Sequence, residues 1–145
     1  SSIWKYVGGL MSTVKANDLT NVTGGIPTVK SQQLIPTAWV NFNGSGTVAI
    51  RGSENVSSIT DGGVGRYGVN LSITLANTNY AISITGTCAN TASGHCQLDS
   101  LSWGGAGEVT GMTTTSFKIR GNSGAATVVD IDHENVNAIV MGGQA

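Results

Sequence analysis

The segment from Ala38 to Leu75 constrains the fold most, because it alternates apolar with polar residues and is interrupted only by glycine-rich turns. Val40 and Phe42 alternate with asparagines before the turn at residues 43–46, and residues 66–75 carry the longest alternating run. Successive side chains of a strand point to opposite faces, so this pattern predicts strands with one buried and one solvated face. The glycine-rich turns between them predict hairpins.

Strand signals continue after this segment at intervals of about 8 to 12 residues, a spacing typical of all-β sandwiches and barrels. We therefore expect an antiparallel β-sandwich or barrel-like domain over residues 36–145. Residues 1–35 show little alternation, and we expect them to form a stalk, extended or partly helical, whose apolar residues need a partner. The predicted strands span residues 36–43, 46–51, 55–60, 66–75, 79–87, 97–103, 114–120, 125–131 and 135–141.

The last predicted strand carries apolar side chains on both faces over residues 136–141. One face would join the domain core, and we expect a neighbouring subunit around a threefold axis to cover the other. The alternative is a strand that is central in one sandwich and meets a loop with its second face. Trp39 points away from Val40 and Phe42 if its strand is regular, so it is either exposed or part of a subunit interface.

Composition limits the classes of partner. The 145-residue chain has the size of one domain, and its 7 basic and 8 acidic residues give a net charge of −1. Such a balance provides no field to attract nucleic acid or an anionic membrane. No stretch approaches the roughly 18 apolar residues of a membrane-spanning helix. Charged residues make up only 10%, and the uncharged polar surface suits carbohydrate contacts or simply reflects many turns.

The chain begins with Ser1 and has neither an initiating methionine nor a basic leader, so we expect it to be a fragment of a longer polypeptide. Its segment AWVNFNGSGTVAIRGSENVSSITDGGVGRYGVN, residues 38–70, resembles a module common at the C-terminal ends of tailed-bacteriophage tail fibre, tailspike and appendage proteins. The pattern of that module runs close to A-W-V-N-F-N-G-T-G-T-V-A-I-R-x-S-x-N-V-S-S-I-T-D-x-G-x-G-x-Y-x-V-N. A looser similarity continues from Asn79 to Gly142, and the departures at Gly52, Glu54 and Arg66 fall in predicted turns.

The resemblance implies a homotrimeric distal domain that binds a bacterial surface receptor, with polysaccharide as the expected class. It also implies a place in the phage virion, assembly in the host cytoplasm, and attachment to the remainder of a parent fibre protein. Two alternatives remain open: an end cap that trimerises and helps the fibre to fold without touching a receptor, and a fragment of a polysaccharide depolymerase. The sequence specifies no carboxylate pair or nucleophile, so we expect a binding module without enzymatic activity or cofactor.

The ligand-contacting tip is predicted in residues 88–110, the most irregular part of the domain. An exposed Trp103 would offer a flat apolar face on which a sugar ring can stack. Polar side chains around it would bind the sugar hydroxyls, and the predicted contacts are Asn90, His95 and Asp99. Trp103 in the core is the competing interpretation.

Cys88 and Cys96 are separated by seven residues, which is enough for a disulfide if the flanking strands form a hairpin. A protein that assembles in the reducing cytoplasm rarely contains one, so the sequence leaves this bond open. His95 adds a third possible zinc ligand, but the spacing matches no standard structural zinc site.

Asp130, Asp132 and Glu134 recur at every second position, which on a strand would place three carboxylates on one face. They would be solvated or would share a cation such as Ca²⁺. The run lacks the other ligands of a calcium loop, which favours a solvated strand end without metal. His133 lies among these acids, but no nucleophile is placed near it by the sequence.

Overall fold

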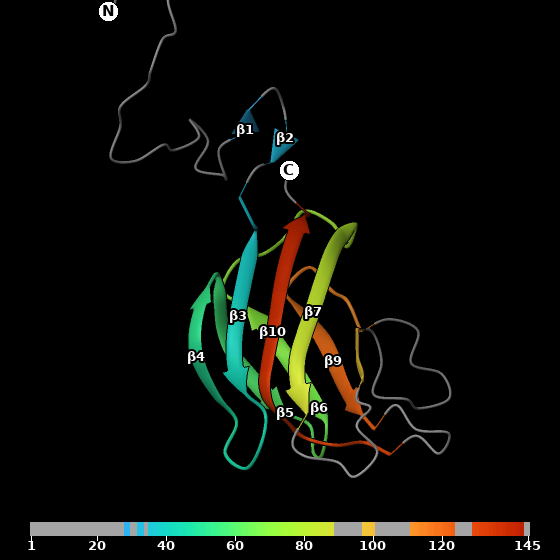
Figure 1. The fold of residues 1–145 in the computed structure, drawn as a ribbon. Helices are drawn as coiled ribbons and strands as arrows, with labels where there is room; N and C mark the ends of the chain where they lie inside the picture. Colours follow the sequence, from blue (N-terminus) through green and yellow to red (C-terminus); the bar gives the residue numbers. More distant parts are fainter. Residues whose placement is uncertain are drawn as a thin grey trace, which may run out of the picture.

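The computed structural model describes residues 28–29, 32–33, 35–88, 97–100, 111–123 and 129–143. The described chain is all-β and contains no helix. Its first sheet has the order β4-β3-β10-β7 and its second sheet the order β5-β6-β9-β8, and every pairing in both is antiparallel (Figure 1). The strands are β1 (Thr28–Val29), β2 (Gln32–Gln33), β3 (Ala38–Asn43), β4 (Ala49–Glu54), β5 (Val56–Asp61), β6 (Arg66–Leu71), β7 (Tyr80–Cys88), β8 (Gln97–Ser100), β9 (Ser116–Asn122) and β10 (His133–Gly142).

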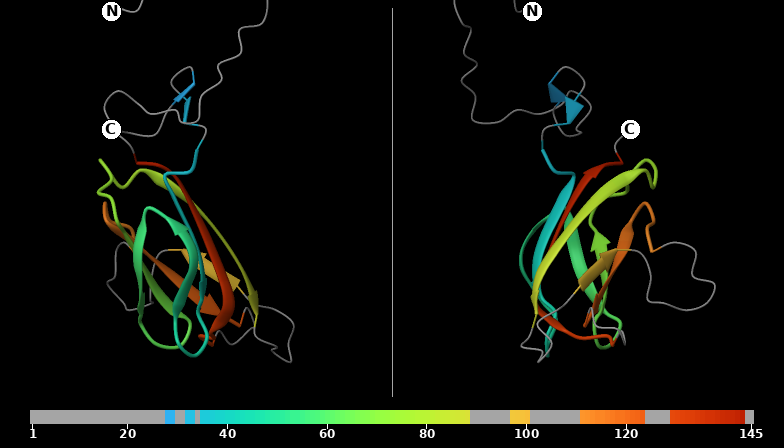
Figure 2. Two further views of the ribbon diagram at one scale, coloured as in Figure 1. Left: turned by 90° about the vertical axis from the view of Figure 1, so that its left-hand side faces the viewer. Right: turned by 45° about the vertical axis from the view of Figure 1, so that its right-hand side comes forward.

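The two sheets face each other as separate layers and enclose one hydrophobic core (Figure 2). Cross-strand pairs that share a face build it: Phe42 lies opposite Val136 in the first sheet, and Val69 lies opposite Phe117 in the second. The layers meet where the rings of Phe42 and Tyr67 pack edge to face, with centroids 5.2 Å apart. The predicted alternation of buried and solvated faces is confirmed in β3, and the apolar residues of β6 are buried as predicted. β4 and β5 contain no buried residue, so the alternation does not extend to them. The all-β antiparallel fold is confirmed.

The connection from β4 in the first sheet to β5 in the second is a single residue, Asn55. This residue adopts a left-handed backbone with φ of 57°, a conformation that asparagine tolerates better than most residues. Its side-chain amide donates a hydrogen bond of 2.8 Å to the carbonyl of Thr37. One edge of the two-layered structure is thus closed by a one-residue connection between β4 and β5.

Two strand predictions were wrong. The strand predicted over 66–75 ends at Leu71, because the chain leaves the second sheet there to return to the first. Leu75 is nonetheless buried, and its N–H donates to the carbonyl of Thr114. The strand predicted over 125–131 is not formed in its described part, where Asp130 makes only an isolated bridge with Asn122.

The predicted stalk, residues 1–35, falls almost wholly outside the described residues. Within it, β1 and β2 pair as a short antiparallel ribbon beyond the end of the sheets at which β10 finishes (Figure 1). The stalk and the trimer stay predictions. No helix in the described part of the chain is long and apolar enough to cross a membrane.

Candidate functional site

The predicted tip is only partly described. Trp103, Asn90 and His95 lie outside the described residues, so their roles as ligand contacts stay predictions. Asp99 belongs to β8, where its Cα lies opposite that of Arg120. Cys96 also lies outside the described residues, so the question of a disulfide between Cys88 and Cys96 stays open.

The outer face of the first sheet, which points away from the second sheet, presents two large apolar side chains. Trp39 is 41% exposed and Ile139 is 45% exposed, and they are direct cross-strand neighbours on β3 and β10. This confirms the prediction that Trp39 points away from the core. It also confirms that the last strand is apolar on both faces, since Val136, Ala138 and Val140 on its other side are buried.

Gly52 on β4 allows the indole of Trp39 to lie close to the sheet. A Cβ atom at this position would stand 3.3 Å from Cη2 of the ring, nearer than side chains normally pack. The benzo ring therefore rests over the β4 backbone. Beside it is a shallow apolar depression of about 210 Å³, lined by Pro36, Trp39, Val40, Asn41, Asn137, Ala138 and Ile139.

Polar side chains form rows across the same face. Asn41 donates from Nδ2 to Oδ1 of Asn137 over 2.6 Å, one row from the Trp39–Ile139 pair. In the next row Arg51 donates from Nη1 to Asn135 Oδ1, and the Asn135 amide donates to the hydroxyl of Thr87 over 3.1 Å. An amide can make four hydrogen bonds, and the Asn41–Asn137 bond uses one donor of Asn41 and one lone pair of Asn137, so both side chains keep further hydrogen-bond capacity.

The carboxylates predicted to share one strand face do not do so, and this interpretation was wrong. β10 begins only at His133, so Asp130 and Asp132 precede the strand. Asp132 accepts from the N–H of Gly65 over 2.7 Å, while Glu134 is exposed. The described residues contain no group of three or more histidine, cysteine or acidic side chains placed to hold a metal ion.

Asp130 is an ion-pair partner rather than a solvated group. Its two oxygens accept from Nε of Arg66 over 2.9 Å and from Nε of Arg120 over 2.7 Å. Burial alone would raise the pKa of this carboxyl, but the hydrogen bonds from the two arginines outweigh it and lower the pKa. Asp130 thus links Arg66 on β6 to Arg120 on β9, on the outer face of the second sheet.

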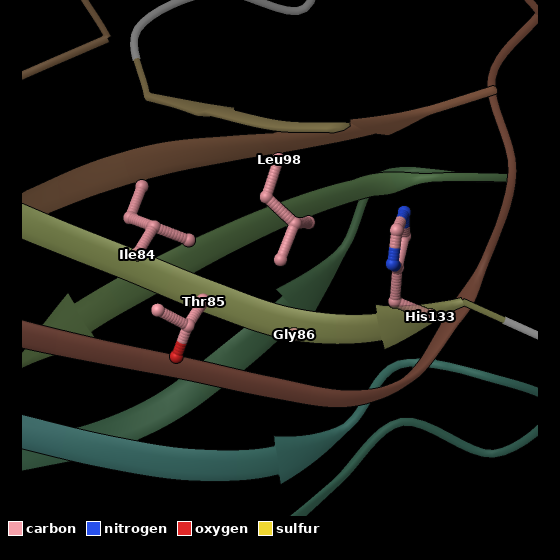
Figure 3. Close-up of a pocket in the computed structure, with 5 residues that line it drawn as sticks. All are labelled: Ile84, Thr85, Gly86, Leu98 and His133. Atoms are coloured by element: carbon pink, nitrogen blue, oxygen red, sulfur yellow. The ribbon is translucent and has the colours of Figure 1, made fainter. Parts of the chain in front are cut away.

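A second site lies between the sheets, around Tyr67 and His133. The Tyr67 hydroxyl donates to the carbonyl of Gly44 over 2.9 Å and accepts from the His133 N–H over 3.0 Å. Burial, partly offset by the backbone of His133, raises the pKa of this phenol to about 12, so it stays protonated. His133 also borders an open pocket of about 250 Å³ that is lined by Ile84, Thr85, Gly86 and Leu98 (Figure 3). Its ring is fully buried.

Sequence reasoning missed most of these residues as site residues. Asparagines at 41, 43, 135 and 137 alternate within two strands, and this signal could have indicated a polar face. Nothing in the sequence indicated that the two strands are neighbours. The chain matches no protein-family model, no curated protein and no solved structure.

Proposed function

We propose that this chain is the distal domain of a phage tail fibre or tailspike and binds a polysaccharide of the bacterial host surface. The observation that carries the proposal is the half-exposed Trp39 ring, held over Gly52 and next to the Asn41–Asn137 amide pair. An exposed indole stacks on the apolar face of a sugar, and amides bind its hydroxyls. The resemblance of residues 38–70 to phage fibre modules supports the biological setting.

The proposed site is shallow, so a single copy would bind weakly. Three copies in a homotrimer on one fibre would bind the same cell together, and the linkage would raise the overall affinity without any new contact. The proposal assigns binding and no catalysis. In support, Asp130 is engaged by two arginines and Asp132 by a backbone amide.

A second candidate function uses the same face as a contact between copies of the chain. Ile139 and Ile35 are 45% and 51% exposed, and Pro36, the next residue after Ile35, lines the depression beside Trp39. Exposed apolar side chains that gather in one region favour a protein contact. This candidate corresponds to the end cap that trimerises a fibre without touching a receptor.

The test measures attachment and assembly in the same variants. Trp39→Ala should reduce binding to host cells and to their purified polysaccharide at least tenfold, with an unchanged mass in light scattering. Val64→Ala removes an apolar side chain that is 60% exposed on a different surface loop and should change neither. If Trp39→Ala lowers the mass, the face is a subunit interface. If the variant keeps both its mass and its attachment, the receptor site lies elsewhere, with residues 88–110 as the next region to test.

A further inference from the structure

A basic side chain reaches the outer face of the first sheet from a bulge in β4. Asn41 of β3 pairs with Gly52, but the next residue of β3 pairs with Ile50. Arg51 is therefore an extra residue between the two pairs, and a bulge of this kind redirects a side chain. The Arg51 side chain extends from β4 past β3 to β10, where Nη1 donates to Asn135 Oδ1.

Neighbouring side chains fix the position of this guanidinium. Asn135 accepts from Arg51 and donates to Thr87, so its own orientation is set from both sides. A guanidinium has more N–H donors than this one bond uses. Arg51 is exposed, and no acidic side chain among the described residues forms an ion pair with it. Its remaining donors are therefore accessible to a ligand.

The charges of this face are separated along the strands. Glu54 on β4 is exposed, and its Cα lies opposite that of Trp39. Ile139 lies opposite Trp39 on the other side, and Asn135 precedes Ile139 by four residues on β10. At about 3.3 Å per residue, the guanidinium on Asn135 is roughly 13 Å from Trp39 along the strands. This span exceeds one sugar ring, so a ligand that contacts both groups contains more than one sugar.

We propose that the polysaccharide bound by this face is acidic, and that Arg51 pairs with a carboxylate or phosphate of one sugar while an uncharged sugar of the same polymer stacks on Trp39. This inference rests on the proposed function and adds the class of polymer. The fork of an arginine matches either anionic group with two parallel hydrogen bonds. Glu54 repels a second negative charge near Trp39, which keeps the anionic group at the Arg51 end. The Asn41–Asn137 amides lie between the two contacts and bind hydroxyls.

The test uses an array of bacterial polysaccharides in which each acidic polymer is printed in three forms: untreated, with its carboxylates reduced to alcohols, and with its phosphates removed. The protein should bind acidic polymers, and removal of the anionic group should weaken binding at least about tenfold, because a hydrogen bond between charged groups is lost. The treatment that weakens binding identifies the group as carboxylate or phosphate. Raising the salt concentration from about 0.05 to 0.5 M should also weaken binding of the untreated polymer, since the ion pair is exposed to solvent.

Two variants assign the effect to one side chain. Arg51→Gln should bind the untreated and the treated polymer equally, because the group that distinguishes them is gone. Arg66→Gln is the matched control, since it removes the same charge from the outer face of the second sheet, and it should keep the preference for the untreated polymer.

Two results would overturn this inference and leave the proposed function standing. One is equal binding of acidic and neutral polymers that Trp39→Ala abolishes. The other is a preference for acidic polymers that persists in Arg51→Gln, because a different basic group would then contact the anion. Binding to no polymer on the array, or binding that Trp39→Ala leaves unchanged, would contradict the proposed function and this inference with it. If a variant does not fold, the comparison of treated with untreated polymer in the unaltered protein still decides.

Discussion

The outer faces of the two sheets use their side chains differently. On the second sheet, Asn70 donates to the hydroxyls of Ser58 and Thr60, and Asp130 pairs with two arginines. On the first sheet, Trp39 and Ile139 stay exposed beside amides with remaining hydrogen-bond capacity. In the described residues, these polar side chains of the second face pair with one another, whereas the first face also exposes large apolar side chains. This difference is why we place recognition on the first sheet.

The largest expected effect separates the two sides of β3. Phe42 is fully buried and packs against Tyr67, so Phe42→Ala should lower the free energy of unfolding by about 3 to 5 kcal/mol. Trp39→Ala, three residues away on the outer face, should lower it by less than about 1 kcal/mol. Urea unfolding of both variants measures this. Equal destabilisation would mean that Trp39 is a structural residue, and the contrast between the faces would fail.

As the pH falls, stability should first be lost through protonation of His133 between the sheets, and only at lower pH through Asp130 on the outer face of the second sheet. Burial lowers the pKa of His133 from its ordinary value near 6.5, so the unfolded chain binds a proton more readily than the folded one. Stability should therefore be complete above about pH 6.5 and should fall as the pH drops below it. The lowered pKa of Asp130 acts in the same direction, but only at a more acidic pH, below about 3.8.

Thermal unfolding between pH 8 and pH 5 tests the acid prediction. The fall in melting temperature between pH 8 and pH 5 should be unchanged in His95→Gln and smaller in His133→Phe. Direct NMR titration of His133 gives the same answer without a variant. A His133 pKa at or above 6.5 in the folded protein would contradict the prediction.

Asp130→Ala should affect stability but not recognition. The substitution leaves two arginine side chains without their shared carboxylate, but both are partly exposed, so we expect a loss of about 1 kcal/mol. Attachment to host cells should not change, because the pair lies on the second sheet. A greater loss of attachment than in Trp39→Ala would move the receptor site to this sheet.

The smallest effect is expected at the amide row of the first sheet. Asn137→Ala removes the 2.6 Å bond to Asn41 on a partly exposed surface, which should cost about 0.5 to 1 kcal/mol of stability. Binding to the polysaccharide should weaken by a few fold, less than in Trp39→Ala. Asn70→Ala, a similar change on the outer face of the second sheet, is the control and should leave binding intact. Equal effects of the two on binding would show that Asn137 makes no direct contact.

Much of the fold could be predicted because the pattern of a strand is local. Alternation along residues 38–43 was enough to place Phe42 inside and Trp39 outside, and both faces of residues 136–141 were identified as apolar. The same reasoning failed where the chain changes sheets. Residues 72–75 continue the alternation of β6, yet they are not part of its strand, because pairing with a neighbour and not the pattern decides where a strand ends.

The amino-acid sequence by itself determined the strand-rich class, the side of each strand that is buried, and the turns that glycine and asparagine permit. Only the tertiary structure decided which strands are neighbours. Asn41 and Asn137 are 96 positions apart and meet because β3 pairs with β10, and the same pairing places Ile139 beside Trp39. The Tyr67 hydroxyl likewise meets the backbone of His133, 66 positions away, and Arg66 meets Asp130, 64 positions away. The physical reason is that side-chain direction follows from the geometry of consecutive residues, whereas strand partners follow from the burial and hydrogen bonding of the whole chain.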